Sequence, residues 1–290
     1  MRFVTLGRCL LLGALLAGGI ANVVSAQDEM PEGVSLEVFA NGIAAEVPQE
    51  AGQILLVELT MTAGSTLPLE PETNTVSLVA VREGELSGKL DTPIEIGRAD
   101  AAPGQTEAAA AGSAFTLVAG DSALIPAGAA GEMTSGEASL SALLLVAAPG
   151  APDNGAGGVA PDGVTFTPLA AGDTPALDEG ALFWLGQFTL QPGASFPGQA
   201  QPGAELGAGT AGEFTMKTTG GPGFVVLRDF TQSVSAGEQP AVAEETTGDT
   251  VTFGAGDAVY FPDGNTVDIS NEGSTEAVTL FGGVGRLPAE

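Results

Sequence analysis

The side chains of this chain that could do chemistry are carboxylates and amides. The 290 residues include no histidine and a single cysteine, Cys9. No Ser-His-Asp or Cys-His arrangement can therefore form. The only lysines, Lys89 and Lys217, are far apart in the sequence, and the glycine-rich stretches lack the lysine and hydroxyl of a phosphate loop. Two groups of closely spaced Glu and Gln residues remain as candidate sites.

The first group is Glu70 and Glu72, followed by Ser77. Residues two apart on an extended segment point the same way, so the two carboxylates would share one face. They could bind a hard cation such as Ca²⁺ weakly, although that ion takes six to eight oxygen ligands. The alternative is that both are solvated surface charges, which is the usual situation of glutamate.

The second group is Gln199, Gln201 and Glu205, with Val267 further along. Glutamine amides donate to and accept from hydroxyl and amide groups, so these residues could line a polar pocket for a small neutral ligand such as a sugar. Glu205 in a desolvated cavity would have a raised pKa and could act as an acid or base. The alternative is that these polar groups pair with one another or with water.

A duplicated frame of glycine and proline residues surrounds both groups. The first copy is Gly64, Glu70, Glu72, Ser77, Gly84, Gly120, Pro126 and Gly128, and the second is Gly193, Gln199, Gln201, Glu205, Gly212, Gly256, Pro262, Gly264 and Asn271. This spacing resembles the two motifs of the cupin family. The first of those reads Gly, five residues, His-x-His, three or four residues, Glu, six residues, Gly. The second reads Gly, five residues, Pro-x-Gly, two residues, His, three residues, Asn.

The resemblance implies a metal held by the histidines and the glutamate of these motifs. In the first copy those positions are Glu70, Glu72, Ser77 and Gly131, and in the second they are Gln199, Gln201, Glu205 and Val267. The frame is therefore present without its histidines. We expect both metal sites to be lost, with no metal and no cofactor.

The resemblance also implies two tandem jelly-roll barrels, and the rest of the sequence agrees with an all-β fold. The 43 glycines and 19 prolines separate short apolar or alternating runs, which is typical of strands in a barrel or sandwich. We predict a first barrel at 34–148, a linker at 149–162 rich in Gly, Pro and Ala, and a second barrel at 163–287. Polar inserts at 96–112 and 231–248 have a composition that favours disorder. The aromatic residues gather in the second unit, where we expect them to form its core: Phe183, Trp184, Phe188, Phe196, Phe214 and Phe261. The alternative is an aromatic-lined cavity that stacks on an apolar or sugar ring.

Residues 1–26 have the pattern of a signal peptide. Arg2 and Arg8 precede an apolar stretch, and Val24-Ser25-Ala26 offers small residues for cleavage after Ala26. A retained anchor is the alternative. Cleavage would remove the only cysteine and place the protein in a secreted or periplasmic location, with no membrane insertion. The net charge of −28 disfavours nucleic acid and anionic lipid as partners and favours solubility. An oligomer stays possible.

These observations predict an exported, acidic, non-catalytic protein that binds a small neutral ligand or interacts with a partner. No catalytic residue is assigned, and the ligand-pocket candidates are Gln199, Gln201, Glu205, Val267, Glu70, Glu72 and Ser77. Two alternatives stay open. One is a cupin-type enzyme that uses Glu205, or Glu70 and Glu72, with a hard cation or no metal. The other is a purely structural envelope protein.

Overall fold

A computed structural model describes residues 30–47, 52–71, 74–102, 105–149, 160–174, 180–198, 200–238, 240–244 and 249–287. The predicted signal peptide and residues 150–159 of the predicted linker lie outside these residues. Within them, none of the helices has the length and apolar character needed to cross a bilayer.

The described residues form strands almost throughout, so the all-β prediction is confirmed. The first half contains β1 (Val34–Ala44), β2 (Gly52–Met61), β3 (Thr66–Leu69), β4 (Val76–Glu83), β5 (Glu85–Leu90), β6 (Ile94–Gly97), β7 (Thr106–Ala109), β8 (Ala114–Val118), β9 (Ser122–Ile125), β10 (Gly131–Ser135) and β11 (Leu140–Pro149). The second half contains β12 (Val164–Thr174), β13 (Ala181–Leu190), β14 (Ser195–Phe196), β15 (Gly203–Ala211), β16 (Glu213–Gly220), β17 (Val225–Arg228), α3 (Phe230–Ser235), β18 (Ala241–Glu244), β19 (Thr250–Gly254), β20 (Ala258–Phe261), β21 (Thr266–Ser270) and β22 (Ala277–Gly285). Both inserts expected to be disordered hold ordered elements, β7 in one and α3 and β18 in the other, so that expectation is wrong for these parts.

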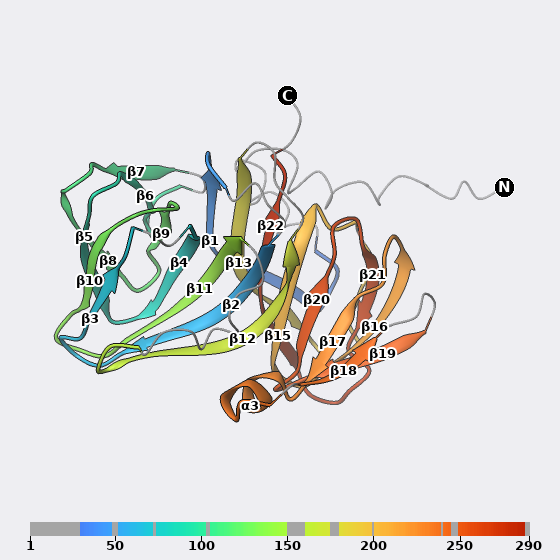
Figure 1. The fold of residues 1–290 in the computed structure, drawn as a ribbon. Coiled ribbons are helices and arrows are strands. Elements are labelled where there is room, and N and C mark those ends of the chain that lie inside the picture. Colours follow the sequence, from blue (N-terminus) through green and yellow to red (C-terminus); the bar gives the residue numbers. More distant parts are fainter. Residues whose placement is uncertain are drawn as a thin grey trace.

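Each half builds the same pair of sheets. The first barrel has a seven-stranded sheet in the order β12-β2-β11-β4-β9-β6-β7 and a four-stranded sheet in the order β3-β10-β5-β8. The second has the orders β1-β13-β22-β15-β20-β17-β18 and β14-β21-β16-β19. Figure 1 shows the two barrels side by side, with the small sheets at opposite ends of the molecule. The predicted pair of jelly-roll barrels is confirmed.

The two halves exchange their first strands. β1 pairs with β13 of the second half, whereas β12 pairs with β2 of the first. The two pairings have the same register, including a bulge at Phe39 in one strand and at Leu169 in the other. The predicted units 34–148 and 163–287 follow the chain, but each barrel takes one strand from the other unit.

A short repeat that the sequence analysis did not use explains how both exchanged strands begin. Residues 31–34 read Pro-Glu-Gly-Val and residues 161–164 read Pro-Asp-Gly-Val. Both glycines have φ of 78°, a left-handed conformation that glycine adopts without steric cost. In each copy the valine N–H donates to the proline carbonyl at 3.0 Å, which closes the turn and directs the strand toward the other barrel.

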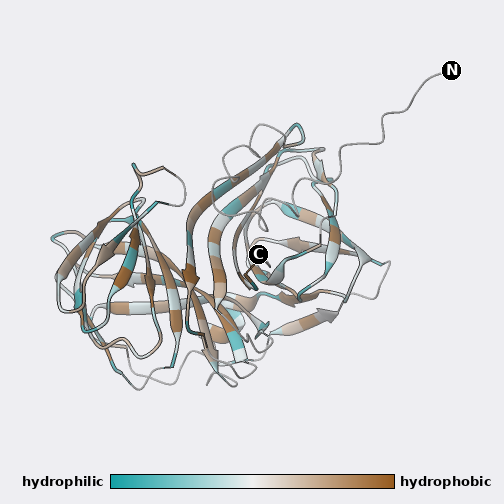
Figure 2. Cartoon of the chain, turned by 90° about the horizontal axis from the view of Figure 1, so that it is seen from above, coloured by the Kyte–Doolittle hydropathy of each residue, from teal (hydrophilic) through white to brown (hydrophobic). Residues whose placement is uncertain are grey.

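Alternation along the strands divides the buried residues among three cores. One core fills each barrel, and the third lies between the two seven-stranded sheets. In β13, Phe183 and Leu185 face the space between the barrels, whereas Trp184 faces the interior of the second. Figure 2 shows hydrophobic strand segments where the barrels meet. Five of the six aromatic residues expected in the second core pack there, and the sixth, Phe183, lies between the barrels instead.

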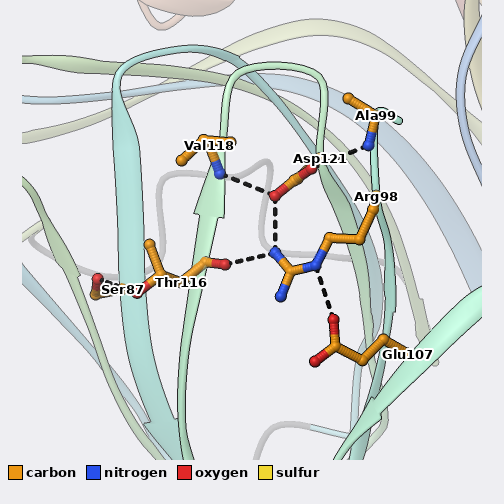
Figure 3. Close-up of polar contacts among 7 residues, drawn as sticks. All are labelled: Ser87, Arg98, Ala99, Glu107, Thr116, Val118 and Asp121. Carbon is orange, nitrogen blue, oxygen red and sulfur yellow. Dashed lines mark hydrogen bonds and ion pairs between the residues drawn. The ribbon is translucent and has the colours of Figure 1, made fainter. Parts of the chain in front are cut away.

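An arginine–aspartate pair fixes the same corner of each barrel. In the first, Arg98 contacts the buried carboxylate of Asp121 at 2.8 Å and donates to the carbonyl of Thr116. The N–H groups of Ala99 and Val118 also donate to that carboxylate (Figure 3). Burial works to raise the pKa of Asp121, but these donors hold it below its usual value.

The second barrel repeats this arrangement with Arg228 and Asp257, which accepts N–H bonds from Asp229 and Gly254. In both barrels the aspartate follows a glycine of the duplicated frame with φ near 90°, Gly120 or Gly256, a conformation that favours glycine.

Candidate functional site

Among the described residues, the site residues predicted in the first unit do not come together in one cluster. Glu70 follows β3 and is exposed, and Glu72 lies outside the described residues. Ser77 is partly buried on β4, on the side that faces the first barrel's interior. Gly131 opens β10 with φ of 143°, and a β-carbon there would lie 2.2 Å from the carbonyl oxygen of Lys89. A side chain at this position would therefore disrupt the pairing of β10 with β5.

The residues predicted in the second unit lie in and around the second barrel. Gln199 is outside the described residues. Gln201 uses its backbone to hold the Pro-x-Gly turn, because its N–H donates to Asn265 O at 2.8 Å and its carbonyl accepts from Gly264 at 3.1 Å. Val267 is buried in the barrel core. Glu205 is partly buried on β15, and its neighbours Ala204 and Leu206 face the other barrel, so its own side chain faces the interior.

Asn271, the last residue of the second frame, has a structural role. It is buried, and its side-chain N–H₂ group donates to the carbonyls of Leu190 and Thr275, both at 2.8 Å. Its side-chain oxygen accepts from the N–H of Gly273 at 2.9 Å. One side chain thus satisfies two backbone groups of the turn between β21 and β22 and ties that turn to the last carbonyl of β13.

The centre of the candidate site is a hydrogen bond between Trp184 and Glu205. The indole Nε1–H donates to Oε2 of the carboxylate at 3.0 Å. The two residues stand on strands separated by β22, where Gly283 is the cross-strand partner of both. A β-carbon on Gly283 would lie 2.2 Å from the indole ring. The glycine therefore leaves the space through which Trp184 reaches Glu205.

The surroundings of Glu205 favour the neutral carboxyl. Phe261 is its partner on the other neighbouring strand, and the nearby core contains Val226, Val259 and Phe224. Burial raises the pKa of Glu205 from an ordinary 4.5 to about 7, and the hydrogen bond from Trp184 opposes that rise. At neutral pH the carboxyl therefore exists in both protonation states, so it can donate or accept a hydrogen bond.

The donor set at these positions does not suit a transition metal. Such sites need three or four converging donors, usually imidazole or carboxylate. Val267 offers none, and one oxygen of Glu205 accepts from Trp184. Among the residues that the structure describes, no three His, Cys, Asp or Glu side chains are placed to hold a metal ion.

The equivalent row in the first barrel has a different composition. Leu55, Val146 and Ser77 occupy the places of Trp184, Gly283 and Glu205. A branched side chain takes the position of the glycine, and a hydroxyl takes that of the carboxyl. The sequence identified Glu205 as a candidate, but it did not predict that Trp184 pairs with it or that Gly283 makes room for the indole. The signal was the run Gly282-Gly283-Val284-Gly285 in a strand that must pack beside the chain's only tryptophan.

No protein-family model matches this chain, and no curated protein matches it. Solved structures with similar folds exist. A mutant of Bacillus subtilis oxalate decarboxylase aligns at 12% identity over 90% of this chain and 78% of that one, with a TM-score of 0.45. A Lactobacillus farciminis oxalate decarboxylase formate complex aligns at 11% identity over 90% and 87%, with a TM-score of 0.44. A cupin 2 conserved barrel domain protein from Leptotrichia buccalis aligns at 10% identity over 88% and 90%, with a TM-score of 0.34.

Proposed function

We propose that this protein is an exported, non-catalytic, bicupin-like binding module whose small-molecule site lies inside the second barrel, at Glu205 and Trp184. The observation that carries the proposal is the contrast between equivalent rows of the two barrels. The first barrel is built with Ser77 and Leu55 at these places, so the fold does not require a carboxyl there. Keeping a carboxyl in an apolar interior costs free energy, and perturbed carboxyls of this kind concentrate at functional sites.

The chemistry of the pair favours a small neutral ligand with hydroxyl or amide groups. Within the described residues only Oε2 of Glu205 has a hydrogen-bond partner, which leaves Oε1 for a ligand donor. The indole N–H of Trp184 holds the other carboxylate oxygen in place. Loss of both metal sites belongs to the same proposal, and it is supported by the absence of histidine from the chain and by the apolar Val267.

Fluorescence tests this proposal directly, because Trp184 is the chain's only tryptophan. We expect one of glucose, galactose, N-acetylglucosamine or glycerol to shift Trp184 emission saturably. Glu205→Gln should weaken that response about tenfold, as expected when a buried hydrogen bond is altered. Glu213→Gln, an exposed change on β16, is the matched control. Absence of a response to all four compounds, or equal loss in both variants, would overturn the proposal.

A second candidate is metal-free proton transfer by Glu205, and the pKa of about 7 favours it. A general acid or base is most effective when its pKa lies near the working pH. The test is deuterium incorporation from D₂O into pyruvate and dihydroxyacetone, followed by NMR. Exchange that disappears in Glu205→Gln would support an enzyme. Exchange no faster than in buffer would leave the binding module as the better proposal.

The export part of the proposal rests on residues 1–26, and N-terminal sequencing of the protein from its native host tests it. A mature start at Gln27 is expected, and an intact Met1 would contradict cleavage.

A further inference from the structure

The outer face of the small sheet in the second barrel, β14-β21-β16-β19, carries two polar rows. Cross-strand pairing aligns Ser195, Ser270, Thr215 and Thr252 in one row, so all four strands contribute a hydroxyl. The next row aligns Asp268, Lys217 and Thr250, with Pro197 following β14 beside them. The intervening residues Phe214, Met216 and Phe253 pack in the core, which places both rows on the solvent side.

This face is hollowed. A groove of about 320 Å³ is lined by most of the two rows together with neighbouring residues: Ser195, Phe196, Pro197, Thr215, Lys217, Thr250, Asp268, Ile269, Ser270 and Glu272. Four strands spaced as in any sheet make the hydroxyl row roughly 14 Å long, longer than one sugar ring. The groove is therefore shaped for an extended ligand.

Several polar groups of the groove have no protein partner. Within the described residues, no hydrogen bond or ion pair occupies the hydroxyls of Ser195, Thr215 and Thr250 or the ammonium of Lys217. Asp268 is positioned by the N–H of Gly198, which donates to its Oδ1 at 2.6 Å and holds the loop after β14 against the sheet.

The equivalent face of the first barrel carries the same two rows, but its hydroxyls satisfy one another. Thr66, Thr134, Ser87 and Thr116 form the hydroxyl row, and Glu132, Lys89 and Ala114 form the next. Thr66 and Thr134 lie 3.1 Å apart through their hydroxyl oxygens, and Ser87 and Thr116 lie 2.9 Å apart (Figure 3). The chain's only two lysines thus occupy equivalent positions. On the second face, however, only Ser270 of the row has a described partner, the carbonyl of Thr215 at 3.5 Å, and the hydroxyls of Ser195, Thr215 and Thr252 have none among the described residues.

We propose that the groove on the second barrel's small sheet binds a neutral oligosaccharide. Unpaired hydroxyls, an ammonium donor and a carboxylate acceptor match the alternating donors and acceptors of a sugar chain. Pro197, exposed just after β14, supplies an apolar contact for a sugar ring. The strongly acidic chain repels polyanions, so the ligand is a neutral glycan and not an acidic one. This site is separate from Glu205 and Trp184 and does not depend on the function proposed for them.

Isothermal titration calorimetry with soluble hexasaccharides tests the proposal on the whole protein. The probes are cellohexaose, xylohexaose, maltohexaose and mannohexaose, with the hexamer of galacturonic acid as the charged comparison. We expect at least one neutral hexasaccharide to bind and the acidic one not to bind. The double variant Thr215→Val/Lys217→Ala should weaken binding about tenfold, since it removes two hydrogen-bonding groups without disturbing strand formation.

The matched control is Ser87→Val/Lys89→Ala, which makes the equivalent changes on the first barrel. It should alter affinity less than twofold, and Glu205→Gln should leave hexasaccharide binding unchanged. Three results would overturn the proposal: no binding by any neutral hexasaccharide, stronger binding of the acidic hexamer, or equal loss in the matched control. Loss in Glu205→Gln would also overturn it, because binding would then lie inside the barrel. Circular dichroism of each variant verifies that it is folded.

Discussion

The two barrels fill equivalent interior positions of their large sheets with different side chains. At equivalent places in the large sheet, the first barrel has Leu55, Val146 and Ser77, and the second has Trp184, Gly283 and Glu205. A side chain removed from the central strand makes room for a larger ring on the strand beside it. Cores tolerate such exchanges when total volume is kept. Only the second solution brings a hydrogen-bond donor to a buried carboxyl.

This comparison separates what the fold requires from what one barrel has added. Strand order, bulge position and the arginine–aspartate pair occur in both halves, so they belong to the architecture. The Trp184–Glu205 pair and the unpaired hydroxyls of the small sheet occur only in the second. The second barrel is therefore the half in which a ligand should be sought.

Replacing Gly283 with valine, the residue at the equivalent place in the first barrel, should have the largest effect. The added β-carbon would lie 2.2 Å from the indole and must displace it, which breaks the bond to Glu205. Overpacking together with a buried carboxyl left unpaired predicts a loss of about 4 kcal/mol in unfolding free energy. Urea unfolding followed by circular dichroism measures it.

Gly220→Ala is the matched control for this change. Its added carbon would lie 3.6 Å from the nearest atom, an ordinary contact, so the loss should stay below about 1 kcal/mol. A similar loss in both variants would mean that the indole does not depend on the glycine.

The pH dependence of stability should distinguish the two barrels next. The pKa of Glu205 is raised to about 7 in the folded protein, so between pH 4.5 and 7 the folded state binds more protons than the unfolded state. The stabilisation that Glu205 contributes is therefore fully present below pH 4.5. About 3 kcal/mol of it is lost as the pH rises through 7. Glu205→Gln should remove this part of the slope in urea unfolding measured from pH 4.5 to 8. An unchanged slope in the variant would place the carboxyl in solvent.

The sequence predicted the turns of the backbone better than it predicted the pairing of the strands or the candidate site. Gly120, Gly256 and the Pro-x-Gly turns marked strand ends correctly, because a positive φ or a fixed φ acts locally. The exchange of β1 and β12 was missed, since local signals show that a strand forms but not which barrel it joins. The exchange depends on contacts between residues more than 100 positions apart.

The candidate site was predicted only in part, again because local signals do not report contacts between distant strands. The frame identified Glu205 by its place among the glycines, and alternation placed the aromatic residues inside. The hydrogen bond from Trp184 depends on the register of three strands, and no spacing in the chain reports that register. The role of Asp121 was also missed, because its partner Arg98 comes from the preceding insert.

Removing the aspartate of the arginine–aspartate pair, called the clamp below, should lower the unfolding free energy moderately and by a similar amount in the two halves. Asp121→Ala leaves two backbone N–H groups without their acceptor and removes one of the partners of Arg98, which predicts a loss of about 2 kcal/mol. Asp257→Ala should cost the same within about 1 kcal/mol, because its partners are equivalent. Thermal unfolding of the two variants tests whether the clamp belongs to the shared architecture. A loss confined to one variant would show that it does not.

The smallest expected difference is the change with pH in the effect of Trp184→Phe, about 1 kcal/mol between pH 8 and pH 5. Phenylalanine keeps a ring over Gly283 but removes the indole N–H that donates to Glu205. That donor stabilises the charged carboxylate more than the neutral acid, so its loss should raise the pKa of Glu205 further. The variant should lose about 2 kcal/mol at pH 8, where the carboxylate is charged, and about 1 kcal/mol at pH 5, where it is neutral. Chemical unfolding followed by circular dichroism at both values measures this difference. A loss that is equal at the two values would mean that Trp184 stabilises the barrel by packing alone, as Leu55 does in the first barrel.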